Sequence, residues 1–270
     1  MDKLIFNCSM PRSGSELIQV ILHQNPRIYA STTSPLHAFL TQTQGILAGE
    51  TVRSQNKNIM RKGYMSMCKH MTEGWYKGIT DRPVVIDKSR DWSSEYEWIN
   101  EWNRDPKIIC MIRDLRSIAA SMERNFRKNK HNSFMEQPNE VHNLTVLDRV
   151  NTWLNGVPVG LSLKRIQNLF QKRLDGKIFF IKYEDFCKDP DSWMPNIYDF
   201  IGEELYLHDY NNIIKEIEED DSAFGIFGNH QVRQVLEEPK PNDWEDMIDE
   251  NIAFGIRDSF SWYFDAFGYV

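Results

Sequence analysis

The stretch LIFNCSMPRSGSELIQVIL, residues 4–22, decides the fold of this chain. An apolar run ends at Cys8, a short polar loop around Gly14 follows, and apolar residues at helical spacing begin at Leu17. This order predicts a buried strand, a tight turn and a helix. The first N–H groups of a helix have no intrahelical acceptor, and the helix dipole favours negative charge there. We therefore expect residues 8–17 to form an anion-binding loop.

The same loop argues against a metal-assisted site for a nucleoside triphosphate. A Walker A sequence carries a Lys for the β- and γ-phosphates and a hydroxyl for Mg²⁺. Here the residue directly before Ser15 is Gly14 rather than Lys, and Arg12 is the cation of the loop. We expect an anion held by Arg12 and by backbone N–H groups, without a metal.

Short apolar runs alternate with longer amphipathic stretches along the rest of the chain. The predicted strands are Leu4–Cys8, Ile28–Ala30, Val84–Ile86, Ile108–Ile112 and Ile178–Ile181. Their nearly continuous apolar character is typical of strands that are covered on both faces. The predicted helices are Ser15–Gln24, Pro35–Ala48, Lys57–Tyr76, Ser94–Asn103, Asp114–Arg127, Thr145–Leu174 with a break at Gly156–Pro158, Asp191–Ile201, Tyr210–Glu218, Trp244–Asn251 and Gly255–Phe264. The alternation predicts an α/β fold, a mainly parallel central sheet between two layers of helices, formed by one domain over residues 1–270.

Composition narrows the class of protein further. The chain has 270 residues, 41% of them hydrophobic, and a formal net charge of −7. This composition is typical of a globular protein, and the acidic balance argues against a general nucleic-acid binder. The four cysteines show no metal-ligand spacing, so we expect a reduced, cytoplasmic protein without a zinc site. We also expect no membrane span, because no apolar run is long enough.

A second polar cluster follows the predicted strand Ile108–Ile112. Arg113 ends this strand, and Asp114 is a suitable N-cap for the helix that follows. Ser121 then lies two helical turns into that helix. Arg113 and Ser121 can therefore converge on one oxyanion from two sides.

Taken together, three segments resemble the sulfotransferases that use 3′-phosphoadenosine 5′-phosphosulfate (PAPS). They are PRSGS at residues 11–15, the Arg–Ser pair at 113 and 121, and YED at 183–185. The carbohydrate and tyrosyl-protein branches of that family often read Pro-Arg-Ser-Gly-Thr in the first segment, and bind the 3′-phosphate with an Arg and a Ser eight positions apart. The resemblance implies a P-loop-like fold and a soluble relative of bacterial or viral type.

The resemblance also implies which residues bind the donor. The 5′-phosphosulfate would lie in the first loop, the 3′-phosphate at the Arg–Ser pair with a second contact from a later basic residue, and the nucleotide against a tyrosine. In that order, the expected donor-binding residues are Arg12, Ser13, Gly14, Ser15, Glu16, Arg113, Ser121, Arg233 and Tyr183.

Lys88 follows the strand Val84–Ile86, where the resembled enzymes place a Lys at the bridging oxygen of the phosphosulfate. As the S–O bond breaks, charge builds on that oxygen, and a placed ammonium stabilises it more in the transition state than before. We expect Lys88 and Arg12 to be catalytic for this reason.

A general base is harder to find in the sequence. Residues 30–37 contain no acid where the tyrosyl-protein branch has a Glu, which argues against tyrosyl-protein activity. His37 is the nearest titratable group, and the usual pKa of histidine suits proton transfer near neutrality. The alternatives are His230, Asp87 and Asp91.

The reaction implied by the resemblance is in-line transfer of a sulfuryl group from PAPS to a hydroxyl of a carbohydrate or another small acceptor. Adenosine 3′,5′-bisphosphate (PAP) is released, and no metal is implied. Two other functions stay open: a P-loop kinase of nucleotides or small molecules, and a non-catalytic glycan-binding relative of the same fold. Aromatic residues between Trp75 and Trp102 are typical of a sugar-stacking surface, and equally of buried helix faces.

Overall fold

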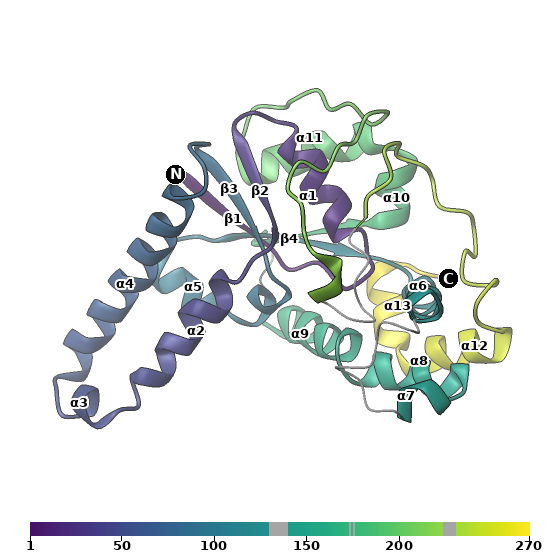
Figure 1. Ribbon diagram of the computed structural model, residues 1–270, viewed down its shortest axis with the longest axis horizontal. Helices are drawn as coiled ribbons and strands as arrows, with labels where there is room; N and C mark the ends of the chain where they lie inside the picture. The colour runs from purple at the N-terminus through teal and green to yellow at the C-terminus, as the bar shows by residue number, and fades with distance from the viewer. Residues whose placement is uncertain (130–139, 173, 175, 224–230) are drawn as a thin grey trace.

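A five-stranded parallel sheet forms the centre of the molecule (Figure 1). The computed structural model describes residues 1–129, 140–172, 174, 176–223 and 231–270. The strands lie in the order β2-β3-β1-β4-β5. Their bounds are β1 Lys3–Asn7, β2 Ile28–Thr33, β3 Val84–Lys88, β4 Lys107–Ile112 and β5 Ile178–Lys182. All five predicted strands are confirmed, and every pairing between them is parallel.

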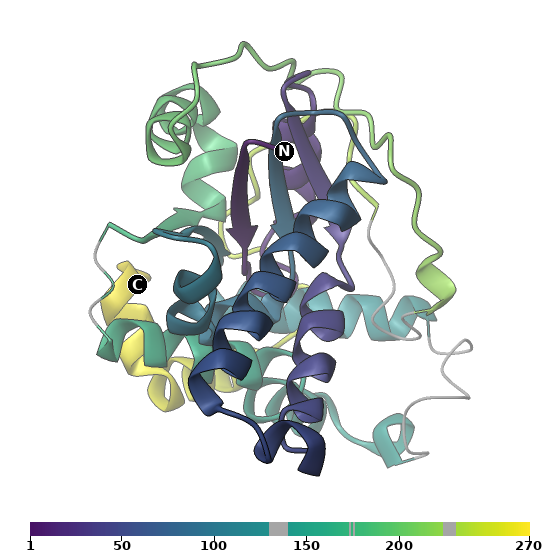
Figure 2. The ribbon, with the colours of Figure 1, turned by 90° about the vertical axis from the view of Figure 1, so that its left-hand side faces the viewer.

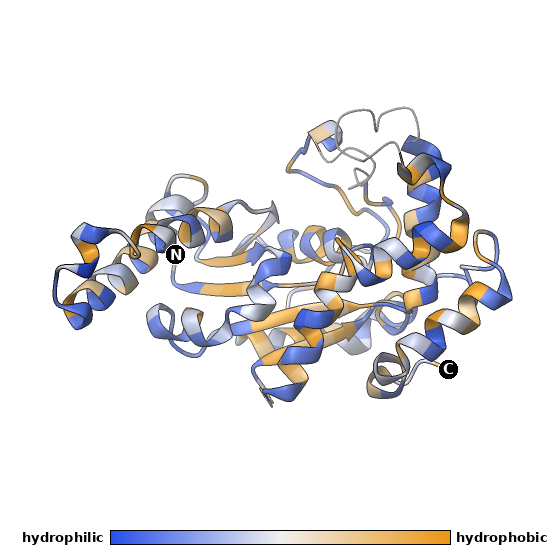
Figure 3. Ribbon diagram, turned by 90° about the horizontal axis from the view of Figure 1, so that it is seen from below, coloured by the Kyte–Doolittle hydropathy of each residue, from blue (hydrophilic) through white to orange (hydrophobic). Residues whose placement is uncertain are grey.

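Alternate residues of the strands point into two separate hydrophobic cores. On β4, Ile109 and Met111 face one core while Ile108 and Cys110 face the other. Successive side chains of a strand point to opposite faces, so a strand that is apolar throughout needs a covering layer on each side. Figure 3 shows the strands as largely hydrophobic ribbons between helices of mixed character. The predicted α/β fold with a central parallel sheet between helices is confirmed.

Helices cover both faces of the sheet. One face is covered by α1 Ser15–His23, α10 Tyr183–Lys188 and α11 Pro190–Ile201. The remaining helices are α2 Leu36–Ile46, α3 Glu50–Arg53, α4 Lys57–Lys77, η1 Arg90–Ser94, α5 Tyr96–Trp102, α6 Leu115–Asn129, α7 Glu140–Asn143, α8 Val146–Asn155, α9 Val159–Gln171, α12 Glu250–Ser259 and α13 Ser261–Phe267. Of these remaining helices, all but α3 place residues in the core on the other face.

Two of these helices project beyond the sheet. In Figures 1 and 2, α2 and α4 lie side by side and extend away from the strands, joined at the far end by α3. The Tyr64 hydroxyl donates to the Leu40 carbonyl at 2.9 Å and fastens the pair. Of the aromatic residues between Trp75 and Trp102, Tyr76 on α4, Trp92 on η1 and Trp102 on α5 are buried in the core.

The predicted helix over Tyr210–Glu218 is wrong. Residues 210–218 form no helix, because their backbone pairs with a later segment instead. The Ile213 N–H donates to Gln234 O at 2.7 Å, and the Leu236 N–H donates to Tyr210 O at 2.8 Å. The amphipathic pattern of residues 210–218 therefore belongs to a non-helical segment that pairs with residues 234 and 236.

The predicted boundaries near the C-terminal end also need correction. The helix expected at Trp244 begins only at Glu250, where the Asp249 side chain accepts from the Ile252 N–H at 2.9 Å. It then runs through Gly255, where a boundary was expected, to Ser259. The predicted break near Pro158 is confirmed, since α8 and α9 are separate helices.

Candidate active site

The polar loops gather at the carboxyl edge of the sheet. The order β2-β3-β1-β4-β5 places β1 between β3 and β4, with the chain first turning towards β2 and later towards β5. Ligands of open α/β sheets bind at such a switch point, outside the carboxyl ends of the strands. The loops that follow β1, β3, β4 and β5 all reach this edge.

The loop between β1 and α1 is a tight cradle. Arg12 and Gly14 both adopt the left-handed region, with φ of 59° and 87°. A Cβ on Gly14 would lie 2.5 Å from the Tyr183 ring, so this ring closes against the loop where only glycine fits. The conformation turns the N-terminus of α1 towards the carboxyl edge of the sheet.

Ser13 supports the cradle from beneath. Its side chain is fully buried, and its hydroxyl lies 2.7 Å from Met10 O and 2.9 Å from Met111 O. Both atoms are backbone acceptors, so the hydroxyl is committed to the protein. Of the residues predicted to hold an anion here, Ser13 shapes the loop, whereas Gly14, Ser15 and Glu16 line the cavity above it.

Arg113 joins the loop after β4 to the loop after β1. Its Nη1 donates to Arg12 O at 3.1 Å, and its guanidinium lies 4.5 Å from the centre of the Tyr183 ring. Its Nη2 forms an ion pair with Asp243. Its Nε is buried and has no hydrogen-bond partner among the described residues. A buried donor without an acceptor is costly, so this edge of Arg113 fits an anionic ligand.

Arg12 and Ser121 meet in space although 109 positions separate them in the sequence. The Arg12 Nε donates to Ser121 Oγ at 3.1 Å. Asp114 caps α6 as predicted, because its carboxylate accepts from the Arg116 N–H at 2.8 Å. Burial, and then the positive charge of Arg113, lower the pKa of Arg12. Two guanidinium groups so close together favour an anion between them.

Lys88 is held by a carboxylate at the other side of the cradle. It is 8% exposed, and its ammonium pairs with Glu16, which is equally buried. Lys215 binds the second oxygen of the same carboxylate at 3.0 Å and Glu219 at 2.8 Å. Glu16 therefore positions Lys88 rather than offering its negative charge to an anion.

One cavity of about 710 Å³ collects most of the predicted site residues. Its size is typical of a pocket for a small-molecule ligand. The predicted residues that line it are Arg12, Gly14, Ser15, Glu16, Lys88, Arg113, Ser121, Tyr183 and Arg233. Burial raises the pKa of Tyr183 to about 12, so this tyrosine is neutral at pH 7.

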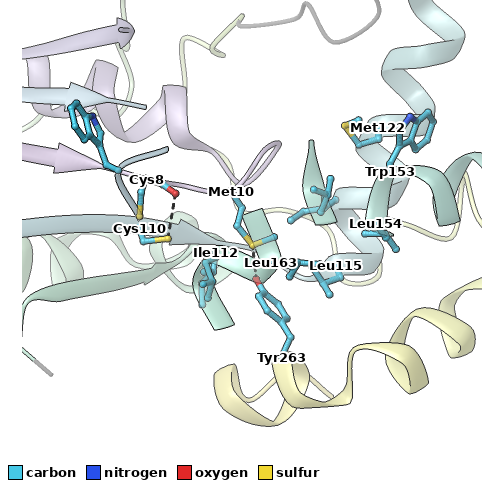
Figure 4. Close-up of a cluster of buried hydrophobic side chains, with 14 of the residues drawn as sticks. Cys8, Met10, Cys110, Ile112, Leu115, Met122, Trp153, Leu154, Leu163 and Tyr263 are labelled. Atoms are coloured by element: carbon cyan, nitrogen blue, oxygen red, sulfur yellow. Dashed lines mark hydrogen bonds between the residues drawn. The ribbon is translucent and has the colours of Figure 1, made fainter. Parts of the chain in front are cut away.

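A buried tyrosine from the end of the fold braces the two loops. Tyr263 on α13 donates its hydroxyl hydrogen to Arg113 O at 2.9 Å and accepts from the Arg113 N–H at 3.3 Å. Figure 4 shows its ring pointing towards Met10, whose sulfur lies 3.3 Å from the hydroxyl. The last helix thus supports both Arg113 and the first loop.

The predicted bases lie apart from the cavity lining. His37 packs edge-on against Trp92, and its Nδ1 lies 3.6 Å from Asp91. Asp91 also pairs with Arg165. Asp87 is fully buried between the hydroxyl of Tyr76 and the indole N–H of Trp92. His230 lies outside the described residues.

Two residues of the site were missed by sequence reasoning. Asp243 binds Arg113 and Ser117, and Lys215 binds Glu16. An acidic side chain repels a phosphate, so sequence reasoning did not consider Asp243 as part of a phosphate site. Lys215 lay in the segment predicted as a helix, and no sequence motif linked it to the site.

The described part of the chain contains no helix long and apolar enough to cross a membrane. It also contains no group of three or more His, Cys, Asp and Glu residues that could hold a metal ion.

Comparisons with known proteins agree with this architecture. No curated protein matches the sequence. The solved structure of a sulfotransferase domain from the curacin biosynthetic pathway is 17% identical, with a TM-score of 0.57 over 97% of this chain and 98% of that chain. Mouse sulfotransferase SULT7A1, solved with PAP, is 17% identical, with a TM-score of 0.52 over 98% and 84%. A retinol dehydratase solved with retinol and PAP is 14% identical, with a TM-score of 0.50 over 97% and 81%.

These structures share the fold. The family model described as "Sulfotransferase family" matches residues 5–207, which include the cradle, Lys88, Arg113, Ser121 and Tyr183. The match spans well over half of the chain and follows the order of segments that the sequence indicated. This chain therefore belongs to the sulfotransferase family, and it is a transferase.

Proposed function

We propose that this enzyme transfers a sulfuryl group from PAPS to a hydroxyl of a carbohydrate or another small acceptor and releases PAP. The observation that carries the proposal is the buried Nε of Arg113, which has no hydrogen-bond partner within the described part of the chain and lies in the same cavity as the cradle at Gly14. Two anion-binding positions in one cavity match a nucleotide whose ribose carries phosphate groups at both the 5′ and the 3′ position. The two similar structures solved with PAP share this fold, which supports the same choice of ligand.

In this proposal each phosphate group of the donor meets its own group of residues. The N-terminus of α1 and Arg12 hold the 5′-phosphosulfate, with Ser13 shaping the loop below. Arg113 and Ser121 take the 3′-phosphate, and Arg233 provides a second contact. Tyr183 lies against the nucleotide beside Arg113. Ionised groups bind phosphate more strongly than neutral ones, so the arginines contribute most of the affinity.

The transfer itself needs positioning and charge stabilisation. The acceptor oxygen attacks sulfur, the bond from sulfur to the bridging oxygen breaks, and the electron pair stays on the released phosphate. Lys88 moves from Glu16 to that oxygen as its charge grows, while Lys215 remains beside Glu16. His37 stays our proposal for the base that takes the acceptor proton. Burial lowers the pKa of His37, so its imidazole is neutral at pH 7 and can accept a proton.

Titration calorimetry with Arg113→Ala tests the donor assignment. We expect PAP to bind about 10- to 100-fold more weakly, the range for hydrogen bonds to charged groups, and adenosine 5′-monophosphate to change far less. Lys240→Ala removes another positive charge from the cavity lining, and should weaken both nucleotides by similar, small factors. Equal losses for both nucleotides in Arg113→Ala would overturn the assignment.

Transfer is tested with PAPS and a panel of carbohydrates and small hydroxyl compounds. Sulfated product with release of PAP supports the proposal. Tight PAP binding without product from any acceptor would point to the non-catalytic alternative.

A further inference from the structure

Asp243 stands at the position that the proposed function gives to the 3′-phosphate. Its Oδ2 pairs with Arg113 Nη2, and its Oδ1 accepts from the Ser117 hydroxyl. The Asp243 side chain is 20% exposed and that of Arg113 is 12% exposed, so water screens this pair only partly. Asp243 is itself a residue of the cavity lining. In this structure, a carboxylate of the chain therefore supplies the anion at Arg113.

The carboxylate satisfies Arg113 incompletely. Nε and Nη2 form one edge of a guanidinium, which matches two oxygens of a phosphate side by side. Asp243 binds Nη2, whereas Nε is buried without a partner among the described residues. A phosphate offers three acceptor oxygens and a charge near −2, so it can bind both nitrogens at once. The exchange of carboxylate for phosphate thus gains a hydrogen bond.

The backbone around Asp243 is anchored by contacts that do not involve its carboxylate. Arg124 Nη2 lies 3.3 Å from Asp243 O. Trp244 is buried, and the guanidinium of Arg116 lies 5.5 Å from the centre of its ring. The carboxylate can therefore leave Arg113 by rotation of its own side chain, with the segment in place.

We propose that Asp243 is a specificity-determining residue that reserves Arg113 for the 3′-phosphate. The inference rests on the proposed function, because it takes PAPS and PAP as the ligands. Asp243 is a tethered counter-ion: a free anion such as sulfate has to displace it without other contacts, whereas the 3′-phosphate is brought to the Nε–Nη2 edge by a nucleotide that is also held at its 5′-phosphate. Donor and product both carry this phosphate, so Asp243 weakens both and eases product release.

Calorimetry on Asp243→Asn tests the proposal, with Asp246→Asn as the matched control. Both residues line the cavity in the same segment and both changes remove one negative charge, but Asp246 has no contact with Arg113 among the described residues. We expect PAP to bind about tenfold more tightly to Asp243→Asn, the lower end for a charge-assisted hydrogen bond, and clearly less so to Asp246→Asn. Adenosine 5′-monophosphate should bind all three proteins alike, which also shows that they are folded.

Sulfate provides the second readout. We expect millimolar sulfate to compete with PAP in Asp243→Asn and to have little effect on PAP binding by the wild-type protein. Weaker PAP binding by Asp243→Asn, or the same change in both variants, would mean that Asp243 merely supports Arg113 or acts by general charge, and either result overturns the proposal.

Crystal structures of the wild-type protein with and without PAP test the exchange without any substitution. We expect the Asp243 carboxylate to leave Arg113 when PAP binds, and a retained pair would overturn the inference. A wild-type protein that binds no PAP would refute the proposed function itself. A wild-type protein that binds PAP and keeps the pair would refute only the role of Asp243.

Discussion

Arg113 makes three different kinds of contact through one side chain. It donates to the backbone of Arg12, pairs with Asp243 and lies over the ring of Tyr183. The sequence predicted Arg113 as an anion ligand because a strand end and a helix start surround it. It could not predict Asp243, because 130 positions separate the two residues and a carboxylate there opposes the expected charge pattern.

Lys88 provides a prediction at the scale of a residue. We expect Lys88→Ala to lower kcat about 10²- to 10³-fold, the usual cost of removing one donor to a developing oxyanion. The affinity for PAP should change little, because the ammonium acts on charge that develops during transfer. Single-turnover assays with PAPS and calorimetry with PAP measure the two effects.

Lys215→Ala is the control for this prediction. It also removes one ammonium from Glu16, but Lys215 is not part of the cavity lining among the described residues. We expect the kcat of Lys215→Ala to fall far less than that of Lys88→Ala. An unchanged single-turnover rate in Lys88→Ala would remove Lys88 from the mechanism.

At the scale of elements, the strands were predictable because each is a short apolar run. A strand that is covered on both faces has no polar side, so β4 reads IICMI with no interruption. The cradle was predictable for a similar reason, since β1, Gly14 and α1 follow one another directly. The structure of segment 210–218 was not predictable, because it pairs with residues 234 and 236, and local sequence periodicity carries no information about such a contact.

Gly14 provides a prediction about the turn between β1 and α1. We expect Gly14→Ala to be destabilising, because its φ of 87° costs an L-residue about 1–2 kcal/mol and its Cβ would meet the Tyr183 ring at 2.5 Å. PAP binding should weaken at the same time, since both loop and ring would shift. Urea unfolding and calorimetry measure these two losses.

Gly63→Ala is the opposite control. Gly63 lies within α4, and a Cβ there would meet nothing within 4 Å. Alanine should therefore stabilise the protein by about 0.5–1 kcal/mol and leave PAP binding unchanged. A Gly14→Ala protein as stable as wild type would show that the loop tolerates another conformation.

At the scale of the whole molecule, stability should fall in mild acid because of His208. Burial lowers the pKa of His208 to about 4, and its Nε2 lies 3.0 Å from the Tyr198 hydroxyl. An unfolded histidine titrates near 6.5, so between these pH values the unfolded chain binds more protons than the folded one. The contribution of His208 is complete above about pH 6.5 and is lost as the pH falls towards 4.

Urea unfolding at pH 7.5 and pH 5 measures this effect. We expect the wild-type protein to be less stable at pH 5, and His208→Gln to lose less stability between the two values. Part of the difference should remain, because burial also lowers the pKa of His23 and of His37. An identical loss in wild type and His208→Gln would exclude His208 as a source of the acid sensitivity.

The two cores on opposite faces of one sheet bring distant parts of the chain together. The assignment of residues 1–270 to one domain stays a prediction.

The position of β1 in the middle of the sheet has a consequence for biosynthesis. Its register joins Lys3 to Val84 and Ile5 to Lys107, so both neighbours are made about 80 to 100 residues later. A ribosome therefore releases the central strand long before either of its two partner strands, β3 and β4, exists. Contacts between residues so far apart in sequence slow folding, and until they form the apolar residues of β1 stay exposed. Chaperone demand during translation should be greatest in that interval.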